Sequence, residues 1–360
     1  MKVVLVHDWL IHMRGGEKVL EAMLEVFPDA PIYTLFSDRK KLSSGLQNAV
    51  IENSFLQSIP GIRHFYPWLL PLLPWVIRTL KIPAADLVIS SSHCVAKGVK
   101  IPEGAQHICY CHTPMRYLWG FEGEYFGKFP VLLRILIKWI LVGLRKWDTA
   151  SNTGVRHFIS NSENVRRRIQ TYYGRESEVI YPPFDAGLFQ PLGEARHYYL
   201  VVSAFVPYKR VDLVIRAFNS LDRQLFIVGS GSMAASYQKL RKSDRIYFLG
   251  SVSGPRLREL YAGARALIFP TDEDFGIVPV EAQACGTPVI ALHKGGALES
   301  VQGGVFFEDQ TPEAIQKAVY EFEASVFDRS AIAKSVAGFD KEHFKEKLKT
   351  FVASCYVQSA

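Results

Sequence analysis

Short apolar runs alternate with helix-like patterns along this chain, and the alternation occurs in two successive series. Such runs are typical of strands buried on both faces, which occur in parallel sheets. Parallel strands need crossover connections, so the segments between them are expected to be helices. The sequence therefore predicts an α/β protein with two Rossmann-like, doubly wound sheets. The expected strands are 3–7, 87–90, 107–111 and 157–160 in the first series, and 198–202, 224–228, 246–249, 266–269 and 289–291 in the second.

The length of 360 residues favours two domains over one. The turn-rich segment 181–187 separates the two series. We expect an N-terminal domain over 1–182, a C-terminal domain over 183–340, and a last helix over 341–360 that packs back on the first domain. Two such sheets that face each other form a cleft at the carboxyl ends of their strands, where ligands of these folds bind.

The charge is distributed unevenly along the chain. Residues 1–180 hold 22 Lys and Arg against 15 Asp and Glu, a net of +7, whereas the remainder is neutral. A basic half suits nucleic acid, an anionic membrane or a phosphorylated substrate. No helix-turn-helix, zinc-finger or RNA-binding aromatic signature accompanies the charge, so nucleic acid is not expected as a partner.

Cysteine usage indicates a reducing, cytoplasmic location. Five Cys residues are an odd number without a framework spacing. Cys109, Cys111 and His112 superficially resemble a metal cluster, but no second pair stands at zinc-site spacing, so no metal is expected. No apolar run is long enough to span a membrane, and residues 1–7 are expected to form a buried strand rather than a signal peptide.

Two glutamates separated by seven residues, Glu273 and Glu281, give the strongest functional signal. The first follows the apolar run 266–269 and is expected in a loop, whereas the second lies in a short helix that the Gly-Thr-Pro at 286–288 would end. The helix N-terminus near Gly276 directs free N–H groups outward, which suits a phosphate. One carboxylate could orient a sugar and the other a ribose, although two Glu at this spacing also occur by chance.

Paired glycines and cations follow other predicted strands. The pair Gly15-Gly16 would let backbone N–H groups approach an anion, although a tight turn without a ligand explains it equally well. Lys209-Arg210 could neutralise a diphosphate, or could simply be solvated at the surface. Gly295-Gly296 repeats the arrangement of a glycine pair after a strand. Gly229-Ser-Gly231 lacks the full dinucleotide fingerprint and is expected to be a turn bordering the cleft.

His112 directly follows the predicted strand 107–111. A His at this position, fixed by the Thr-Pro that follows it, can contact a substrate hydroxyl, although a capping or core histidine is the commoner explanation. Asp8, Arg14 and Arg116 are candidates for contacts with an acceptor substrate.

The order of these motifs resembles that of family-4 retaining glycosyltransferases of the GT-B fold. The resemblance covers nearly the whole chain and is most specific over roughly 198–300. The N-terminal half is similar to the subgroup that adds mannose to lipid-linked O-antigen or exopolysaccharide intermediates. The motifs are Gly15-Gly16, His-Thr-Pro-Met-Arg at 112–116, Asn161-Ser162, Pro-Tyr-Lys-Arg at 207–210, the Glu273–Glu281 pair and Gly-Thr-Pro-Val-Ile-Ala at 286–291.

The resemblance implies roles for side chains. Glu273 would contact hydroxyls of the donor sugar, and Glu281 would bond the ribose. Lys209 would hold the diphosphate, and His112 would contact an outer hydroxyl of the sugar. Many family members carry an Arg five residues before this Lys. Here that position is Ala204, so Arg210 or another cation is expected to replace it, or diphosphate binding is weakened.

The resemblance also implies roles for the backbone. Amides around Phe275, Gly276 and Ile277 would face the sugar and phosphate. Gly15-Gly16 would approach the phosphates from the N-terminal, acceptor-binding domain, and the loop 250–254 of the nucleotide-sugar-binding domain would border the base.

The implied reaction transfers a hexose, with retention and without a metal or cofactor, from a nucleotide diphosphate sugar to a hydroxyl of a lipid-linked glycan in cell-surface polysaccharide synthesis. GDP-mannose is the expected donor, and a UDP- or dTDP-hexose is the alternative. Asp272-Glu-Asp274 could be mistaken for a metal-binding Asp-x-Asp motif. We also consider an epimerase of similar fold and a non-catalytic subunit that binds sugar nucleotides.

Two segments of the N-terminal half indicate a membrane surface. Residues 64–75 are rich in aromatic residues and prolines, and the predicted helix 131–147 is apolar with a basic stripe of Arg134, Lys138 and Arg145. A mostly buried helix with snorkelling cations explains the same pattern. We expect peripheral attachment to the inner face of the cytoplasmic membrane.

Overall fold

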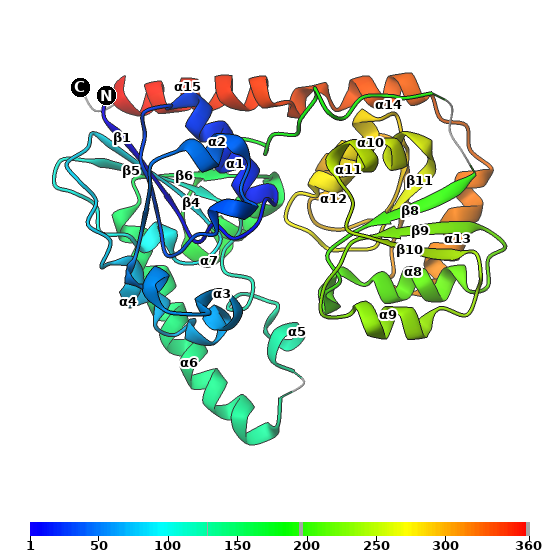
Figure 1. The fold of residues 1–360 in the computed structure, drawn as a ribbon, viewed down its shortest axis with the longest axis horizontal. Coiled ribbons are helices and arrows are strands. Elements are labelled where there is room, and N and C mark those ends of the chain that lie inside the picture. Colours follow the sequence, from blue (N-terminus) through cyan, green and yellow to red (C-terminus); the bar gives the residue numbers. More distant parts are fainter. Residues whose placement is uncertain (128, 194–196, 358–360) are drawn as a thin grey trace. The chain divides into compact units, whose positions relative to one another are not determined.

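The computed structural model describes residues 1–127, 129–193 and 197–357. The chain forms two compact units. Unit 1 comprises Met1–Pro183 and Phe344–Ala360, and unit 2 comprises Phe184–His343. Each unit is built on one parallel sheet with helices packed on it (Figure 1). The predicted fold class, α/β with two Rossmann-like sheets, is confirmed.

The sheet of unit 1 has seven strands in the order β3-β2-β1-β4-β5-β6-β7, and every neighbouring pair is parallel. Its strands are β1 (Val3–His7), β2 (Ile32–Thr34), β3 (Ile51–Asn53), β4 (Leu87–Ser92), β5 (Gln106–Cys111), β6 (His157–Ser160) and β7 (Ser177–Val179). The α-helices are α1 (Gly15–Val26), α2 (Ser44–Asn48), α3 (Ile62–Phe65), α4 (Leu73–Ile77), α5 (Glu122–Phe126), α6 (Val131–Ala150), α7 (Glu163–Tyr173) and α15 (Lys341–Val357).

Both faces of this sheet are buried, which explains why β1 is apolar from Val3 to Val6 and β4 from Leu87 to Ile89. Successive side chains of β1 point to opposite faces. Val3 and Leu5 pack in a cluster with α1 and α15, whereas Val4 and Val6 pack in a second cluster with α4 and α6. A half-exposed strand would instead show polar residues at every second position.

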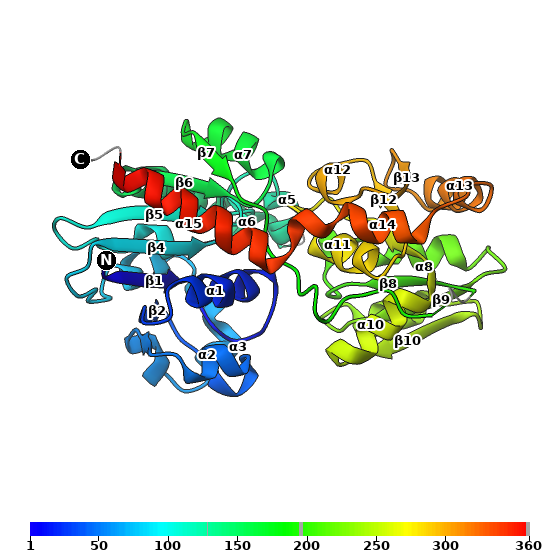
Figure 2. The same ribbon diagram turned by 90° about the horizontal axis from the view of Figure 1, so that it is seen from above.

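The helix α15 completes the first of these clusters. Its buried residues Phe344, Leu348, Val352 and Cys355 recur every three or four positions and therefore lie on one face. This stripe packs in unit 1 with residues of β1 and β5, far away in the sequence (Figure 2).

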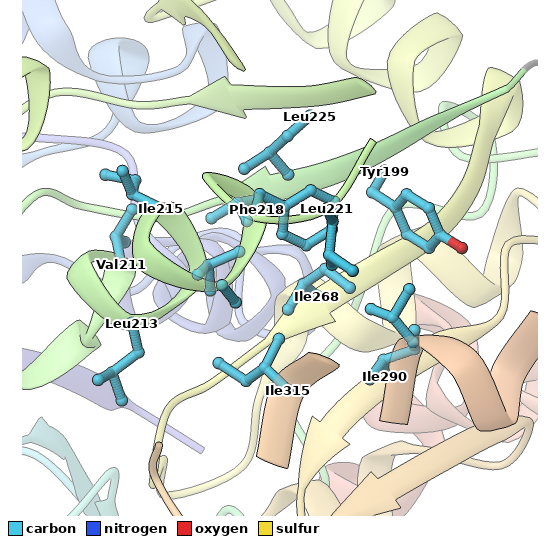
Figure 3. Close-up of a cluster of buried hydrophobic side chains, with 14 of the residues drawn as sticks. Tyr199, Val211, Leu213, Ile215, Phe218, Leu221, Leu225, Ile268, Ile290 and Ile315 are labelled. Carbon is cyan, nitrogen blue, oxygen red and sulfur yellow. The ribbon is translucent and has the colours of Figure 1, made fainter. Parts of the chain in front are cut away.

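The sheet of unit 2 has six parallel strands in the order β10-β9-β8-β11-β12-β13. Tyr199 of β8 and Phe218 of α8 pack edge to face in its core, 5.3 Å apart, together with Ile268 of β11 (Figure 3). The strands are β8 (Tyr198–Val202), β9 (Gln224–Val228), β10 (Ile246–Gly250), β11 (Ala264–Phe269), β12 (Val289–Leu292) and β13 (Gly304–Phe307). The α-helices are α8 (Val211–Phe218), α9 (Ala234–Leu240), α10 (Gly254–Gly263), α11 (Ile277–Ala284), α12 (Ala297–Ser300), α13 (Pro312–Glu323) and α14 (Arg329–Ser335).

Candidate active site

Each sheet has a point where its strand order reverses. In unit 1 the order runs outward from β1 to β3 on one side and from β4 to β7 on the other, and in unit 2 the reversal lies between β8 and β11. Open α/β sheets bind ligands beyond the carboxyl ends of the strands at this switch point. The residues that follow β1 and β4 in unit 1, and β8 and β11 in unit 2, are therefore the candidates for a site.

In unit 2, the predicted site residues Lys209 and Glu273 form an ion pair. Lys209 ends the 3₁₀ turn Pro207–Lys209 after β8, and Glu273 lies in the loop after β11. The two side chains are 16% and 21% exposed. The Thr271 hydroxyl joins the two loops because it donates a hydrogen bond to the Lys209 carbonyl, 3.0 Å away. A charge pair that solvent can reach is also a pair for which the hydroxyls and phosphates of a ligand can compete.

The loop that carries Glu273 rests against the glycines that follow β12. The Gly296 N–H donates a hydrogen bond to the Glu273 carbonyl, 2.8 Å away. A Cβ atom at Gly295 would overlap that carbonyl oxygen, and one at Gly296 would overlap the backbone of Phe275. The loop backbone fills the space, and the glycines position Glu273.

The pair of glutamates is divided between loop and helix, as the sequence predicts. Gly276 precedes α11 with φ of 91°, a conformation that favours glycine, and Ile277 begins the helix beside the buried Phe275. Glu281 lies inside the helix, only 4% exposed, and its Oε2 accepts a hydrogen bond from the Tyr261 hydroxyl at 3.2 Å. Of the two carboxylates, Glu273 is thus the more accessible.

Arg210 has an unusual backbone conformation beside Lys209. Its φ is 51°, and among the residues that the structure describes it is the one non-glycine with positive φ. Its Nε lies 3.3 Å from Asp212 Oδ1. Strained residues of this kind concentrate at functional sites. Ala204 lies in the loop between β8 and the 3₁₀ turn. Gly229 and Gly231 pack so closely against this loop that a Cβ atom at either position would overlap the loop backbone.

In unit 1, the predicted glycines open α1, in the segment that follows β1. The exposed Arg14 is the residue before the helix, and its backbone N–H donates to the Glu17 carboxylate, 3.0 Å away. A Cβ atom at Gly15 would meet open space, whereas one at Gly16 would lie 3.6 Å from His112 Nε2 and from His7 Cε1. Burial raises the pKa of Glu17. The helix start is therefore brought next to the predicted His112.

Three histidines gather at the carboxyl ends of β1, β4 and β5. The ring centroids of His7, His93 and His112 lie 6.1 to 6.4 Å from one another. The Ser91 hydroxyl lies between two of them, 3.0 Å from His7 Nδ1 and 2.8 Å from His112 Nε2. Burial lowers the pKa of His7 to about 4, and burial also lowers the pKa of His112 well below its usual 6.5. Both rings are therefore neutral at pH 7.

The carboxylate of Asp8 is fully buried at the same place. Its Oδ2 accepts hydrogen bonds from the N–H groups of His93 and Cys94, and its Oδ1 from those of Val95 and Ala96, all at 2.6 to 3.0 Å. Burial alone would raise the pKa of Asp8, but the adjacent His93 and the backbone donors hold it well below its usual range. Asp8 in turn raises the pKa of His93, against the partial desolvation of that ring, whose side chain is 32% exposed. The enclosed carboxylate shapes the turn after β4, and a contact between Asp8 and an acceptor stays a prediction.

The other predicted acceptor contacts remain predictions. Arg116 places its guanidinium 4.5 Å from the centre of the Phe121 ring. Arg14 is exposed at the start of α1. Within the described residues, no three His, Cys, Asp or Glu side chains are grouped so that they could hold a metal ion. A cavity of about 540 Å³ in unit 2, lined by residues such as Phe184, Cys285 and Arg329, contains none of the predicted site residues.

Comparison with known sequences identifies the family. Residues 189–335 match the family model described as "Glycosyl transferases group 1". Over residues 189–335, the C-terminal part of the chain therefore has the sequence of a group 1 glycosyltransferase. Its sequence is 29% identical over 210 residues to the O-antigen chain mannosyltransferase RfbU of Salmonella typhimurium, which covers 55% of this chain and 60% of that one. The chain spans about half the length of the curated relatives it matches.

Solved structures place this group 1 glycosyltransferase in the GT-B fold. Sucrose-phosphate synthase from Thermosynechococcus elongatus matches with a TM-score of 0.75 at 17% identity, over 99% of this chain and 100% of that one. HepE of Anabaena, solved with UDP and glucose, matches with a TM-score of 0.70 at 18% identity, over 98% and 100%. The predicted resemblance to family 4, whose members are retaining, metal-independent transferases, is confirmed, and so is the GT-B fold.

Sequence reasoning missed three residues of the histidine cluster: His7, Ser91 and His93. A signal was available. Polar residues at the carboxyl ends of β1 and β4 interrupt two apolar strands at the switch point of the sheet. The bonding between them depends on strand register, in which His7 is the direct partner of Ser91.

Proposed function

We propose that this group 1 glycosyltransferase moves a hexose from a nucleotide diphosphate sugar to an acceptor hydroxyl, with retention of the anomeric configuration. The ion pair between Lys209 and Glu273, at the switch point of unit 2, carries this proposal. The donor's phosphates would take the place of Glu273 beside Lys209, and the sugar hydroxyls would bond the carboxylate so released. The pair thus holds both charges ready before the donor arrives.

The proposed chemistry is a front-side substitution. The acceptor oxygen forms a bond to the anomeric carbon while the bond from that carbon to the diphosphate oxygen breaks. The leaving phosphate accepts the proton of the acceptor hydroxyl. Lys209 and the N–H groups at the start of α11, around Phe275, Gly276 and Ile277, stabilise the charge that grows on the diphosphate. Glu281 bonds the ribose in this proposal. Arg210 replaces the arginine that many family members carry at the position of Ala204.

GDP-mannose is the proposed donor. The similarity to an O-antigen chain mannosyltransferase supports it. A UDP-hexose is the second candidate, because HepE, a protein of the same fold, was solved with UDP and glucose. Calorimetric titration of GDP, and then of UDP, in the presence of a chelator distinguishes the two. Binding of GDP alone supports the mannosyl proposal, binding of UDP alone replaces the donor, and binding of neither contradicts the donor site.

A lipid-linked glycan is the proposed acceptor, and α6 is the main reason. Figure 1 shows α6 extending beyond the helices that cover the sheet of unit 1. Its C-terminal half is anchored by the buried Leu141, Leu144 and Asp148. From residue 131 to residue 142, by contrast, large apolar side chains face solvent. We call these residues the α6 tip: Val131, Leu132, Leu133, Ile135, Leu136, Trp139 and Val142.

Other exposed apolar residues belong to the same side of unit 1. Trp68, Leu72 and Trp75 are each more than half exposed, and the Trp68 ring lies 6.4 Å from that of Phe129, just before α6. Exposed apolar surface of this extent indicates an interaction site. Tryptophans at its border are typical of a membrane interface.

The charge of these segments favours an anionic bilayer as the occupant. The sequence contains no Asp or Glu between 53 and 85 or between 125 and 147, whereas Arg63, Arg78, Arg134 and Lys138 lie in these stretches and are exposed. Within the described part of the chain, no helix is both long enough and apolar enough to span a membrane. We therefore propose that the α6 tip enters one leaflet while its cations bind lipid headgroups.

Vesicle flotation tests this surface. The full chain should float with vesicles that contain anionic lipid. Because each basic residue near such a surface contributes about 1 kcal/mol, Arg134→Gln/Lys138→Gln should weaken binding roughly 30-fold. Leu132→Ser/Leu136→Ser should abolish flotation. The control Tyr320→Ser/Val326→Ser removes exposed apolar residues of unit 2 and should have no effect on flotation. Equal flotation of all variants, or self-association in place of flotation, would contradict the membrane proposal.

A further inference from the structure

The Ser91 hydroxyl lies between two imidazole rings that are both neutral at pH 7. Ser91 is fully buried in β4, and strand register makes it the direct partner of His7 in β1. His112 follows β5, the neighbour of β4 on its other side, and its N–H donates to the Ser92 carbonyl at 2.8 Å. The backbone of the sheet therefore fixes the positions of all three residues in the His7–Ser91–His112 chain.

The number of polar hydrogens on His7, Ser91 and His112 limits how these three side chains can be hydrogen-bonded. A neutral imidazole has one N–H donor and one acceptor nitrogen, and a serine hydroxyl has a single hydrogen to donate. Ser91 therefore donates to one ring and accepts from the other. If it donates to His112 Nε2, the hydrogen of His112 is on Nδ1. If it donates to His7 Nδ1, the hydrogen of His112 is on Nε2, and His112 Nδ1 is an acceptor.

The surroundings of His7 decide between these two arrangements. Its Nε2 is buried and has no hydrogen-bond partner within the described residues. The ring lies against the start of α1, since a Cβ atom at Gly16 would be 3.6 Å from His7 Cε1. The N-terminus of a helix carries a partial positive charge, which favours a lone pair over an N–H at that nitrogen. His7 therefore carries its hydrogen on Nδ1 and donates it to Ser91.

The rest of the chain follows from this choice. The Ser91 hydroxyl, having accepted from His7, donates to His112 Nε2. The hydrogen of His112 must then lie on Nδ1, a nitrogen without a hydrogen-bond partner in the described part of the chain. His112 thus presents an N–H donor, rather than an acceptor, to whatever binds beside it.

We propose that Ser91 is a positioning residue that holds His112 in the Nδ1–H tautomer, so that the ring donates a hydrogen bond to a hydroxyl of the donor sugar. The contact of His112 with the sugar rests on the resemblance to family-4 transferases and on the proposed function, whereas the tautomer does not. Ser91 itself touches no substrate in this proposal. His7 acts one step further back, because it supplies the hydrogen that orients the serine.

The tautomer can be measured directly by NMR of the full chain labelled with ¹⁵N-histidine. In the unsubstituted protein, the ¹⁵N shifts should show a protonated Nδ1 and an unprotonated Nε2 for His112. Ser91→Ala should shift this pattern toward the Nε2–H form. Ser90→Ala is the matched control, because Ser90 is also fully buried in β4 and its hydroxyl lies 2.8 Å from another ring nitrogen, His107 Nε2. The control should leave the His112 signals unchanged.

Two NMR results would overturn the proposal. One is an Nε2–H tautomer of His112 in the unsubstituted protein, a result that needs no variant to fold. The other is an unchanged tautomer in Ser91→Ala. Both can be obtained even if the protein transfers no sugar, so they separate a failure of this inference from a failure of the proposed function.

Kinetics then tests what the tautomer does. Losing a well-placed hydrogen bond costs about 1.4 kcal/mol, so Ser91→Ala should lower kcat about tenfold with little change in KM for the donor. In a His112→Ala background the same substitution should have no further effect, because the ring that Ser91 orients is gone. Effects that simply multiply would overturn the positioning role and indicate a general loss of packing. Ser90→Ala should remain within about twofold of the parent.

Discussion

The two switch points of this molecule use similar sheets for different electrostatic purposes. In unit 2, the loops after β8 and β11 hold an ion pair, Lys209–Glu273, at a place that solvent reaches. In unit 1, the residues after β1 and β4 enclose a carboxylate, Asp8, and surround it with backbone N–H groups and a histidine. Both sites contain an acidic residue beside a basic one. Only in unit 2 can a ligand replace one partner.

Burial accounts for this difference. A buried charge that loses its partner is strongly destabilised, so the fully buried Asp8 is bound to the fold and unavailable for exchange, although the side chain of its partner His93 is 32% exposed. A partly exposed pair contributes little to stability, because water can replace either partner. We infer that unit 1 presents neutral, preoriented groups at its switch point, whereas unit 2 presents charges. Matched substitutions in the two units can test that contrast.

The largest expected effect on stability is that of Asp8→Asn. It removes the charge that faces His93 and turns an NH₂ group toward backbone N–H donors. Loss of one partner from a buried pair costs about 3–5 kcal/mol of the free energy of unfolding. Urea denaturation followed by circular dichroism should show this loss. If the variant keeps the stability of the parent but loses transfer activity, Asp8 contacts the substrate instead of stabilising the fold.

Glu273→Gln, the equivalent change in unit 2, should lower kcat strongly and leave stability almost unchanged. Removing one charge-stabilising contact costs about 3 kcal/mol in the transition state, roughly a hundredfold or more in kcat. Stability should stay within about 0.5 kcal/mol of the parent, because the pair is partly exposed. Initial-rate kinetics and urea denaturation on the same preparation measure both quantities. A stability loss as large as that of Asp8→Asn would abolish the contrast between the units.

Gly296→Ala tests whether the loop of Glu273 depends on the glycines after β12. The added methyl would overlap the backbone of Phe275, so we expect a loss of about 1–3 kcal/mol in stability and a lower kcat. Gly143→Ala is the control, since its Cβ would meet open space within α6. That change should instead stabilise the helix by up to about 1 kcal/mol. If both variants behave alike, close packing of the loop does not position Glu273.

Acidification should weaken unit 1 more than unit 2. Burial lowers the pKa of His7 and of His107 from 6.5 to about 4, so the unfolded chain binds more protons as the pH falls from about 6.5 to about 4. Stability is therefore complete above pH 6.5 and declines below it, by about 1 kcal/mol for each such ring between pH 7 and 5.5. His93 opposes this trend, because its raised pKa stabilises the fold at low pH.

Hydrogen exchange at pH 7 and pH 5.5, corrected for intrinsic rates, measures each unit separately. Amides of β1, β4 and β5 should lose protection at the lower pH, whereas those of β8 and β11 should keep it. The histidines of unit 2 include His293 and His343, which are about half exposed. Equal losses in both units would show that the buried rings do not govern this behaviour.

The long central strands could be predicted because burial on both faces gives each of them a run of apolar residues. The short strand β2 and the short edge strands β3, β7 and β13 were missed, since three or four residues with mixed burial leave no clear pattern. Segment 64–75 folds largely as the short helices α3 and α4 and the 3₁₀ turn between them, which its prolines obscure.

The candidate site could be predicted where its residues belong to a local sequence motif. It could not be predicted where a residue's role depends on contacts with a distant strand or loop. Glu273, Lys209 and Gly276 belong to local patterns of glycine, charge and strand end, and these indicated the site from sequence alone. The role of Gly295-Gly296 depends on which backbone lies opposite, and the enclosure of Asp8 depends on β4, some 80 residues later. Strand register across a sheet is a long-range property, and the sequence near either residue does not contain it.

The placement of α15 has a consequence for how the chain matures on the ribosome. The core of unit 1 includes Phe344, Leu348, Val352 and Cys355, which are synthesised after all of unit 2. Unit 2 is one continuous stretch and has all its strands before that moment. During translation, unit 1 begins first but is completed after unit 2. The apolar face that α15 covers stays exposed to chaperones until this last helix emerges from the ribosome.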